Sequence, residues 1–363
     1  MTENNTLLRY DVDQYLDSDS LERWDGTPPG ISARCLYHRA HEASVRGDIG
    51  QDFIALRANP AHSLLTFAVC DGVGASFLGH LAAAFLGTRL ADWLANPDRR
   101  LATAGHELWY QLRHWTQEGQ LHVQNASLPP NLPPLLSAVL DEKKRYGSET
   151  VFCAGRIAIS PHRTLPTLWL CWMGNVRARI FAPNNTEIPI HPTRIGPPAP
   201  RDLWDDHNRW STTAGPKGSL NIWLVPPHLS IDRIVIYSDG LHAVPEHRLI
   251  ELLDQPDPLR QAILTLQSRS DSDDIALLEI RAISPTAAPA LPIAATIRQP
   301  LATLDTRRRD DPLPAPPTGP SPHPQPAIYP PGSTVPATTL ILAIAISLLI
   351  IAAILVAVKL PSP

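Results

Sequence analysis

Acidic residues stand at the end of two short apolar stretches in this sequence. The mostly apolar run 64–70 ends at Asp71, which is followed by Gly72, and the run 233–238 ends at Asp239, again followed by a glycine. Because each run is short and stops at a glycine, we predict buried strands rather than helices. A carboxylate at the end of such a strand lies at the rim of a sheet, where it can reach a ligand.

Two further acidic positions come directly before apolar stretches. Asp52 precedes the run 53–58, and Asp273 and Asp274 precede the alternating run 275–280. One Asp-Gly pair after a strand is most often a hairpin turn, but two such strands and two acidic strand starts form a pattern that turns do not explain. Gathered carboxylates with few basic residues beside them need compensation, which hard divalent cations such as Mg²⁺ or Mn²⁺ supply.

The predicted elements are segregated along the chain. Strands come first, two or three helices follow, then more strands, two helices and a last strand. This order is typical of α+β layers rather than of alternating βαβ units. Two sheets with helices outside them would place the acidic strand ends at one edge. Strands are expected at 31–38, 52–58, 63–70, 151–160, 168–174, 177–181, 233–238 and 274–280, with a hairpin at Gly174-Asn175, and helices at 77–94, 101–117, 135–144, 245–253 and 259–268.

Composition excludes some classes of protein. A formal net charge of −4 over 363 residues gives no indication of nucleic-acid binding. The four cysteines lie inside apolar runs and form no C-x-x-C pair, which is typical of reduced, buried thiols in a cytosolic fold. The first 30 residues are polar and acidic, so we expect a loosely attached leader without a signal peptide. The cysteines are Cys35, Cys70, Cys153 and Cys171.

The C-terminal part differs in composition. The segment 284–336 is rich in Pro and Ala and cannot bury enough apolar surface to fold, so it is predicted to be an extended linker. The stretch 340–358 carries no charge and is long enough to cross the hydrocarbon layer of a membrane. The predicted division is a leader at 1–30, a folded domain at 31–283, a linker at 284–336, a transmembrane helix at 337–358 and a short tail at 359–363.

The charges around the apolar stretch favour one orientation. Three arginines, 307–309, lie on its N-terminal side and a single Lys359 lies beyond it. The bias of basic residues toward the cytoplasmic side therefore predicts a single-pass C-terminal membrane anchor with the folded domain in the cytoplasm.

These motifs resemble those of the metal-dependent protein phosphatases, the PPM or PP2C family, in a bacterial form. The segment 67–74 resembles the family motif FAV-x-DG-x-G, and 236–241 resembles SDGL. Asp273-Asp274 resembles the DNIT motif, and Gln51-Asp52 the NED or NQD motif. The segment 147–150 resembles the GTT or GST strand start with one inserted residue. The order and approximate spacing agree from about residue 31 to residue 283.

The resemblance implies a four-layer α-β-β-α sandwich of two antiparallel sheets flanked by helices. It also implies two Mn²⁺ or Mg²⁺ ions, bridged by Asp71. Asp52 and the Gly72 carbonyl would bind one ion, and Asp239 and Asp273 the other. A water activated by two such ions could hydrolyse phosphoserine or phosphothreonine without a covalent intermediate.

Three positions depart from the family pattern. The phosphate-binding arginine of the family would fall at Gly47, so the neighbouring Arg46 is the candidate for that role. The acid of the GDSR motif is replaced by Asn175, a poorer ligand for a hard cation, which weakens the case for a third metal. Val73 replaces a histidine that many eukaryotic members carry, which excludes a histidine general acid there.

The leading functional prediction is a membrane-tethered Ser/Thr protein phosphatase that acts on a phosphoprotein and opposes a cognate kinase, with no nucleic acid as partner. The alternative is a degenerate, non-catalytic module of the same fold that binds phosphoproteins or scaffolds a signalling complex. A third interpretation is an α+β domain with ordinary Asp-Gly turns. The retained carboxylates favour the enzyme, whereas Arg46 and Asn175 favour the non-catalytic module.

Overall fold

The computed structural model describes residues 6–18, 20–128, 132–159, 167–197, 203–205, 207–226 and 228–282. All of them lie in the first of the two units into which the chain divides, Met1–Pro300. Among these described residues, no helix is both long and apolar enough to span a membrane. The predicted linker, transmembrane helix and tail at 284–363 lie outside the described residues.

The larger sheet is antiparallel and has nine strands in the described part of the chain. The strand β4 (Phe53–Asn59) pairs with β5 (Leu64–Gly72) so that Phe53 lies opposite Cys70, which puts the start of β4 beside the end of β5. The order along the sheet is β1 (Leu8–Asp11), β4, β5, β6 (Glu149–Ala158), β7 (Thr167–Met173), β12 (Leu220–Leu224) and β9 (Thr193–Ile195), while β10 (Arg209–Ser211) pairs with β6 and with β11 (Gly215–Lys217).

The smaller sheet has five antiparallel strands within the described ranges. Tyr237 at the end of β13 (Arg233–Tyr237) lies opposite Leu277 near the start of β14 (Ile275–Ala282). The two acidic strand ends of this sheet are therefore neighbours, as they are in the larger sheet. The order is β2 (Glu22–Trp24), β3 (Ile31–His38), β14, β13 and β8 (Arg177–Phe181).

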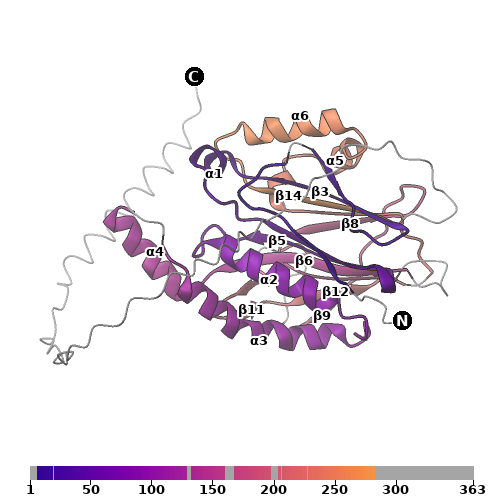
Figure 1. Ribbon diagram of the computed structural model, residues 1–363, viewed down its shortest axis with the longest axis horizontal. Helices are drawn as coiled ribbons and strands as arrows, with labels where there is room; N and C mark the ends of the chain where they lie inside the picture. Colours follow the sequence, from indigo (N-terminus) through magenta and orange to yellow (C-terminus); the bar gives the residue numbers. More distant parts are fainter. Residues whose placement is uncertain are drawn as a thin grey trace, which may run out of the picture. The chain divides into compact units, whose positions relative to one another are not determined.

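Helices cover the outer face of each sheet (Figure 1). The helix α2 (Gly79–Leu94) buries residues at helical spacing, Ala82, Leu86 and Leu90, against the larger sheet beside α3 (Ala104–Asn125). The helices α5 (Glu246–Leu252) and α6 (Pro256–Gln267) pack on the smaller sheet and share a core cluster with Val235 and Leu277. The predicted α+β class with two antiparallel sheets and flanking helices is confirmed.

The space between the sheets is filled by one apolar cluster. Ile54 and Phe67 from the larger sheet and Ile234 and Leu278 from the smaller belong to it, and all four are at most 1% exposed. Burial of four such side chains contributes roughly 1.5–3 kcal/mol each. The remaining helical segments are α1 (His41–Arg46), α4 (Pro134–Tyr146) and the short 3₁₀ turns η1 (Pro60–His62) and η2 (Asp239–Leu241).

The predicted hairpin at Gly174-Asn175 is wrong. The strand β7 before it belongs to the larger sheet and β8 after it to the smaller, so this link crosses between the two sheets. Gly174 adopts a φ of +93°, and a Cβ there would lie 2.2 Å from Val151, so the crossing requires glycine.

The N-terminal segment is more ordered than the sequence predicts. Leu8–Asp11 forms β1, which pairs with β4, and Glu22–Trp24 forms β2, which pairs with β3. The segment expected to be a loose leader therefore adds an edge strand to each sheet.

Candidate functional site

Five aspartates from both sheets gather at one rim of the sandwich; we call them the rim aspartates. Asp52 precedes β4 and Asp71 lies near the end of β5, while Asp239 follows β13 and Asp273 and Asp274 precede β14. The antiparallel pairing described above brings each pair together within its sheet, and stacking of the two sheets brings the pairs together.

Burial, together with repulsion between neighbouring carboxylates, raises the pKa values of four of the rim aspartates, Asp52, Asp71, Asp273 and Asp274. Burial, followed by the charges of Asp71 and Asp274, raises the pKa of Asp52 well above its usual range. Burial also raises the pKa of Asp71, and the charges of Asp239 and Asp273 act in the same direction. Because Asp71 responds to residues of the smaller sheet and Asp52 responds to Asp274, the electrostatic coupling links the two sheets.

The two adjacent acids before β14 have different surroundings. Asp273 is an exposed residue, and partial desolvation together with the charge of Asp239 raises the pKa of its carboxyl group. Asp274 is only 3% exposed. Its carboxylate accepts a hydrogen bond from the backbone N–H of Ala40 at 2.5 Å and another from the backbone N–H of Gln51. Asp274 therefore ties the smaller sheet to the loop that carries Asp52.

Close packing explains the glycine after each strand-end aspartate. A Cβ on Gly72 would lie 2.5 Å from the carbonyl carbon of Gly79, and a Cβ on Gly240 would lie 2.1 Å from the carbonyl oxygen of Asp274. Both distances are shorter than any real contact of a Cβ atom. The two glycines let neighbouring backbone approach the rim, so they are part of its construction and not ordinary turn residues.

The Gly147–Thr150 segment supports the rim from the side of the larger sheet. The Ser148 hydroxyl accepts a hydrogen bond from the backbone N–H of Ala82 at 3.1 Å, in the first turn of α2. The Thr150 hydroxyl donates to the carbonyl oxygen of Asp71 at 2.7 Å. This motif therefore holds both the strand that ends in Asp71 and the helix that follows it.

Several buried oxygen atoms near the rim lack a donor. Oδ2 of Asp52, Oε1 of Gln51 and Oδ1 of Asn175 are buried and have no hydrogen-bond partner within the described residues. Asn175 donates through Nδ2 to Oδ2 of Asp239 at 3.0 Å, which places this residue of the variant GDSR motif in the site. Buried oxygens without donors are costly, and a cation would satisfy them.

The described residues do not form a ready-made metal cage. No group of three or more His, Cys, Asp or Glu side chains among them is arranged so that it could hold a metal ion. The donors that the rim offers are carboxylate oxygens and a backbone carbonyl oxygen, which Mg²⁺ usually binds together with water. The donor set, all oxygen, fits such an ion.

Arg46 lies away from this network of contacts. It is exposed on α1 and pairs with Glu42, one helical turn earlier, at 2.9 Å. Among the described residues no hydrogen bond or ion pair joins Arg46 to the rim aspartates. The structure thus brings together Asp52, Asp71, Gly72, Asp239 and Asp273, and it leaves Arg46 on a surface helix. Its proposed contact with phosphate stays a prediction.

Gln14 was missed by the sequence analysis. Its side chain is 7% exposed and donates to the carbonyl oxygens of Gly50 at 3.1 Å and Asp52 at 2.8 Å. These bonds fix the backbone on both sides of Gln51. Gln14 lies in the segment that the sequence analysis treated as a loose leader, and no local pattern distinguishes it from other polar residues there.

Comparisons with known proteins were made with this geometry in view. No protein-family model matches the sequence, and no curated protein matches it. Among solved structures the chain is similar to a bacterial serine phosphatase, at 15% identity and a TM-score of 0.44, over 69% of this chain and 97% of that one. It is also similar to RsbX in complex with magnesium, at 15% identity and a TM-score of 0.40, over 72% and 98% of the two chains.

A third solved structure is the phosphatase domain of the cell fate determinant SpoIIE from Bacillus subtilis, at 11% identity and a TM-score of 0.33, over 74% of this chain and 97% of that one. Phosphatases are the class whose motifs the sequence resembles. At this level of similarity, what the chain does has to be derived from its own residues.

Proposed function

We propose that this protein is a metal-dependent phosphatase that hydrolyses phosphoserine and phosphothreonine in proteins. The observation that carries the proposal is the meeting of Asp52 and Asp71 from one sheet with Asp239 and Asp273 from the other. Burial and the neighbouring carboxylates raise the pKa values of Asp52, Asp71 and Asp273, and none of these three has an Arg or Lys partner among the described residues. A site that binds cations accounts for this arrangement.

Two bound Mg²⁺ or Mn²⁺ ions would supply an activated water and would offset the charge of the phosphoryl group. In that site Asp71 would bridge the two ions, and its interactions with Asp239 of the other sheet and with Asp52 support this role. Asp52 and the Gly72 carbonyl would serve one ion, and Asp239 and Asp273 the other.

The surrounding residues have supporting roles. The carboxylate of Asp274 accepts hydrogen bonds from the backbone N–H groups of Ala40 and Gln51, so it positions the loop that carries Asp52. Asn175 donates to one oxygen of Asp239 and so would hold this carboxylate in place. Gln14 fixes the carbonyl oxygen of Asp52. Charge on the transferred phosphoryl group is stabilised best by groups held in place before the reaction.

Hydrolysis of a phosphoserine peptide and of p-nitrophenyl phosphate by the full chain tests this proposal. We expect release of phosphate that depends on Mn²⁺ or Mg²⁺, that EDTA abolishes, and that Asp71→Asn or Asp239→Asn removes. Full activity in excess EDTA, or in either variant, would contradict it.

A non-catalytic binding module is the second candidate, and Arg46 is the observation that favours it. Its guanidinium pairs with Glu42 on an exposed helix, and among the described residues it makes no contact with the rim aspartates that would place it for a phosphate. Metal binding at the rim, measured by calorimetry, without any turnover at saturating Mn²⁺ would favour this candidate over the enzyme.

We also propose that the chain is held at a membrane by its C-terminal apolar segment, with the folded domain in the cytoplasm and a cognate Ser/Thr kinase acting on the same substrate. The uncharged stretch 340–358 supports the anchor. Deletion of 340–358 is expected to move the protein from the membrane fraction to the soluble fraction. Retention in the membrane fraction after this deletion would exclude the anchor.

A further inference from the structure

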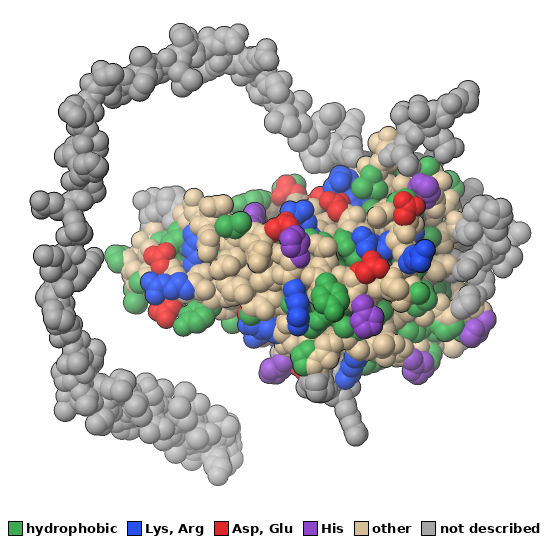
Figure 2. Space-filling model, turned by 90° about the horizontal axis from the view of Figure 1, so that it is seen from below, with side chains coloured by type: hydrophobic (Ala, Val, Ile, Leu, Met, Phe, Trp, Pro, Cys, Tyr) green, Lys and Arg blue, Asp and Glu red, His purple; other side chains and the backbone are tan. Residues whose placement is uncertain are grey.

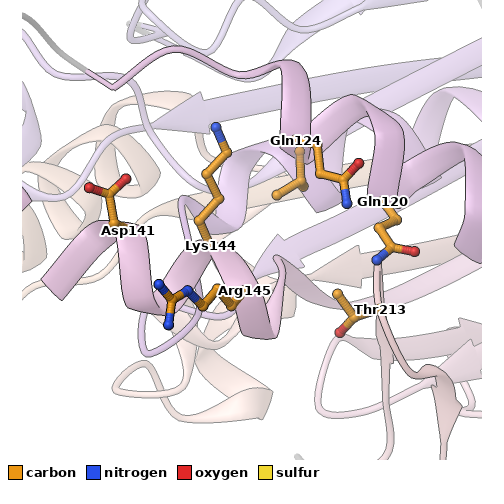
Figure 3. Close-up of a pocket in the computed structure, with 7 residues that line it drawn as sticks. Gln120, Gln124, Asp141, Lys144, Arg145 and Thr213 are labelled. Atoms are coloured by element: carbon orange, nitrogen blue, oxygen red, sulfur yellow. The ribbon is translucent and has the colours of Figure 1, made fainter. Parts of the chain in front are cut away.

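We infer that a polar pocket between α3 and α4 binds a carboxylate-bearing segment of the protein substrate next to its phosphorylated residue. This inference rests on the proposed phosphatase function. The pocket has a volume of about 240 Å³ (Figure 3). Its polar lining comes from Gln120 and Gln124 on α3, from Asp141, Lys144 and Arg145 on α4, and from Thr213 between β10 and β11.

The pocket carries more positive than negative charge. Lys144 donates one hydrogen bond, to the carbonyl oxygen of Ala126 at 2.7 Å, which leaves two of its three N–H groups for a ligand. Arg145 is exposed and makes no hydrogen bond or ion pair within the described residues, and Asp141 one turn earlier does not pair with it. The polar lining contains two cations, two side-chain amides, one hydroxyl and a single carboxylate. The pocket therefore favours an anion.

The size of the pocket limits what it can hold. Small-molecule sites usually enclose about 300–1,000 Å³. A pocket of about 240 Å³ is smaller and suits one side chain or a small anion, not a molecule the size of a cofactor. A glutamate or aspartate side chain fits both this volume and this charge.

One loop connects the pocket with the rim aspartates. The loop 73–78 begins directly after Gly72, and the backbone N–H of Phe77 donates to the carbonyl oxygen of Gly147 at 3.1 Å, just beyond the end of α4. The Lys144 ammonium lies 5.8 Å from the centre of the Phe77 ring. In the proposed complex, a polypeptide with its phosphorylated residue at the rim continues past this loop to the pocket.

The surface around the pocket distinguishes a polypeptide from a free anion. The helix α4 buries none of its residues. Leu135 is 79% exposed and Tyr146 is 70% exposed, while Leu136 and Val139 are 44% exposed each. Figure 2 shows hydrophobic side chains beside both basic and acidic ones at the left end of the described part, where α4 lies in Figure 1. Apolar side chains beside a cationic pocket suit a polypeptide partner.

Two phosphoserine peptides test the inference, one with Glu at positions near the phosphoserine and one with Gln at the same positions. Hydrolysis of both by the full chain is compared with hydrolysis by Arg145→Gln, by Lys144→Gln and by the control Lys143→Gln, because Lys143 neighbours Lys144 in the sequence but does not line the pocket. We expect Arg145→Gln to lower kcat/KM for the Glu peptide about tenfold through KM, and to leave the Gln peptide and p-nitrophenyl phosphate unchanged. Lys143→Gln should match the wild type.

Binding without turnover separates this inference from the proposed function. Fluorescence anisotropy in EDTA, with unphosphorylated Glu and Gln peptides, needs no catalysis. Preferential binding of the Glu peptide that Arg145→Gln removes supports the pocket, even if no phosphate is ever released. Turnover with equal kcat/KM for both peptides, equal binding of both, or loss of the Glu preference in Lys143→Gln would overturn it. Displacement of the Glu peptide by millimolar inorganic phosphate alone would assign the pocket to a free anion and would also overturn it.

Discussion

Two regions of this molecule differ in how the charge of their carboxylates is balanced. On the smaller sheet Glu279 is 1% exposed and is surrounded by arginines: Arg233 donates to it at 2.6 Å, Arg281 at 3.1 Å, and Arg34 also bonds to it. At the rim, Asp52 and Asp71 have no Arg or Lys partner among the described residues. The first cluster is satisfied by the fold itself, whereas the charge of the second is balanced by no side chain of the described residues and calls for protons or a bound cation.

A cation that interacts with one of the rim aspartates illustrates the difference. The charge of Asp274 acts on Arg39, but this guanidinium is bound to the carboxylate of Asp17 at 2.9 Å and to the carbonyl oxygen of Asp48 at 3.0 Å. Arg39 is thereby kept from the rim. This comparison suggests that the cluster around Glu279 contributes to stability and the rim aspartates to function. The experiments below test this.

The largest expected effect is on activity. Asp71→Asn should lower phosphatase activity by about a thousandfold or more, about 4 kcal/mol in the barrier, because the bridging carboxylate is lost. It should not lower the stability of the metal-free protein, because it removes a repelled charge. Phosphate release and thermal unfolding in EDTA measure the two effects. The exposed Asp48→Asn is the matched control, and it should change neither.

The next effect is on stability. Glu279→Gln leaves the buried Arg233, which is 2% exposed, without its partner inside the sheet, so we expect a loss of about 3–5 kcal/mol in the free energy of unfolding. Urea denaturation measures this loss. If Glu279→Gln left the free energy of unfolding unchanged while Asp71→Asn lowered it, the assignment of the two clusters would be reversed.

The third effect is linked to pH and metal. The pKa values of Asp52 and Asp71 are raised above 3.8 in the folded state, so the folded state binds these protons more tightly than the unfolded state. Their contribution is therefore most favourable below pH 3.8 and is lost as the pH rises through the raised values. In EDTA, the Tm of the wild type should fall relative to that of Asp52→Asn as the pH rises above 3.8.

Metal should reverse that loss. At a concentration of about 100 times Kd, a bound ion stabilises the folded state by about 2.7 kcal/mol. Differential scanning calorimetry with Mg²⁺ or Mn²⁺ at neutral pH measures the gain, which should be much smaller in Asp71→Asn. Equal stabilisation of the two proteins would place the metal elsewhere.

The smallest expected effect concerns Gln14. Gln14→Ala removes the donor that holds the carbonyl oxygen of Asp52, at a cost of about 1 kcal/mol, or roughly fivefold in the metal concentration needed for half-maximal activity. Activity at saturating metal should recover. Gln117→Ala, at an exposed position on α3, is the control, and an equal shift there would remove Gln14 from the site.

The sequence could predict those features that local patterns encode. The runs before Asp71 and Asp239 are apolar, short and closed by glycine, and both proved to be strands that end at the rim. The hairpin at Gly174-Asn175 could not be recognised as a crossing, because the sheet that each strand joins is decided by distant partners, Cys153 opposite Trp172 and Val235 opposite Arg179.

The finer details of the site also depend on distant residues. Adjacent acids such as Asp273 and Asp274 point in different directions, and only the position of Ala40 and Gln51 decides that Asp274 is bound by backbone N–H groups. The edge strand Leu8–Asp11 is mostly polar, so its own sequence has no apolar pattern from which its pairing with β4 could be predicted.

The central place of β14 has a consequence for biosynthesis. This strand is the last of the described domain, yet it pairs with β3, which begins at Ile31, on one side and with β13 on the other. Because such long-range pairing waits for both partners, the smaller sheet cannot assemble while the chain is still on the ribosome short of residue 282. A nascent chain that ends before residue 273 lacks the two aspartates that precede β14, so the rim is complete only after translation has passed them.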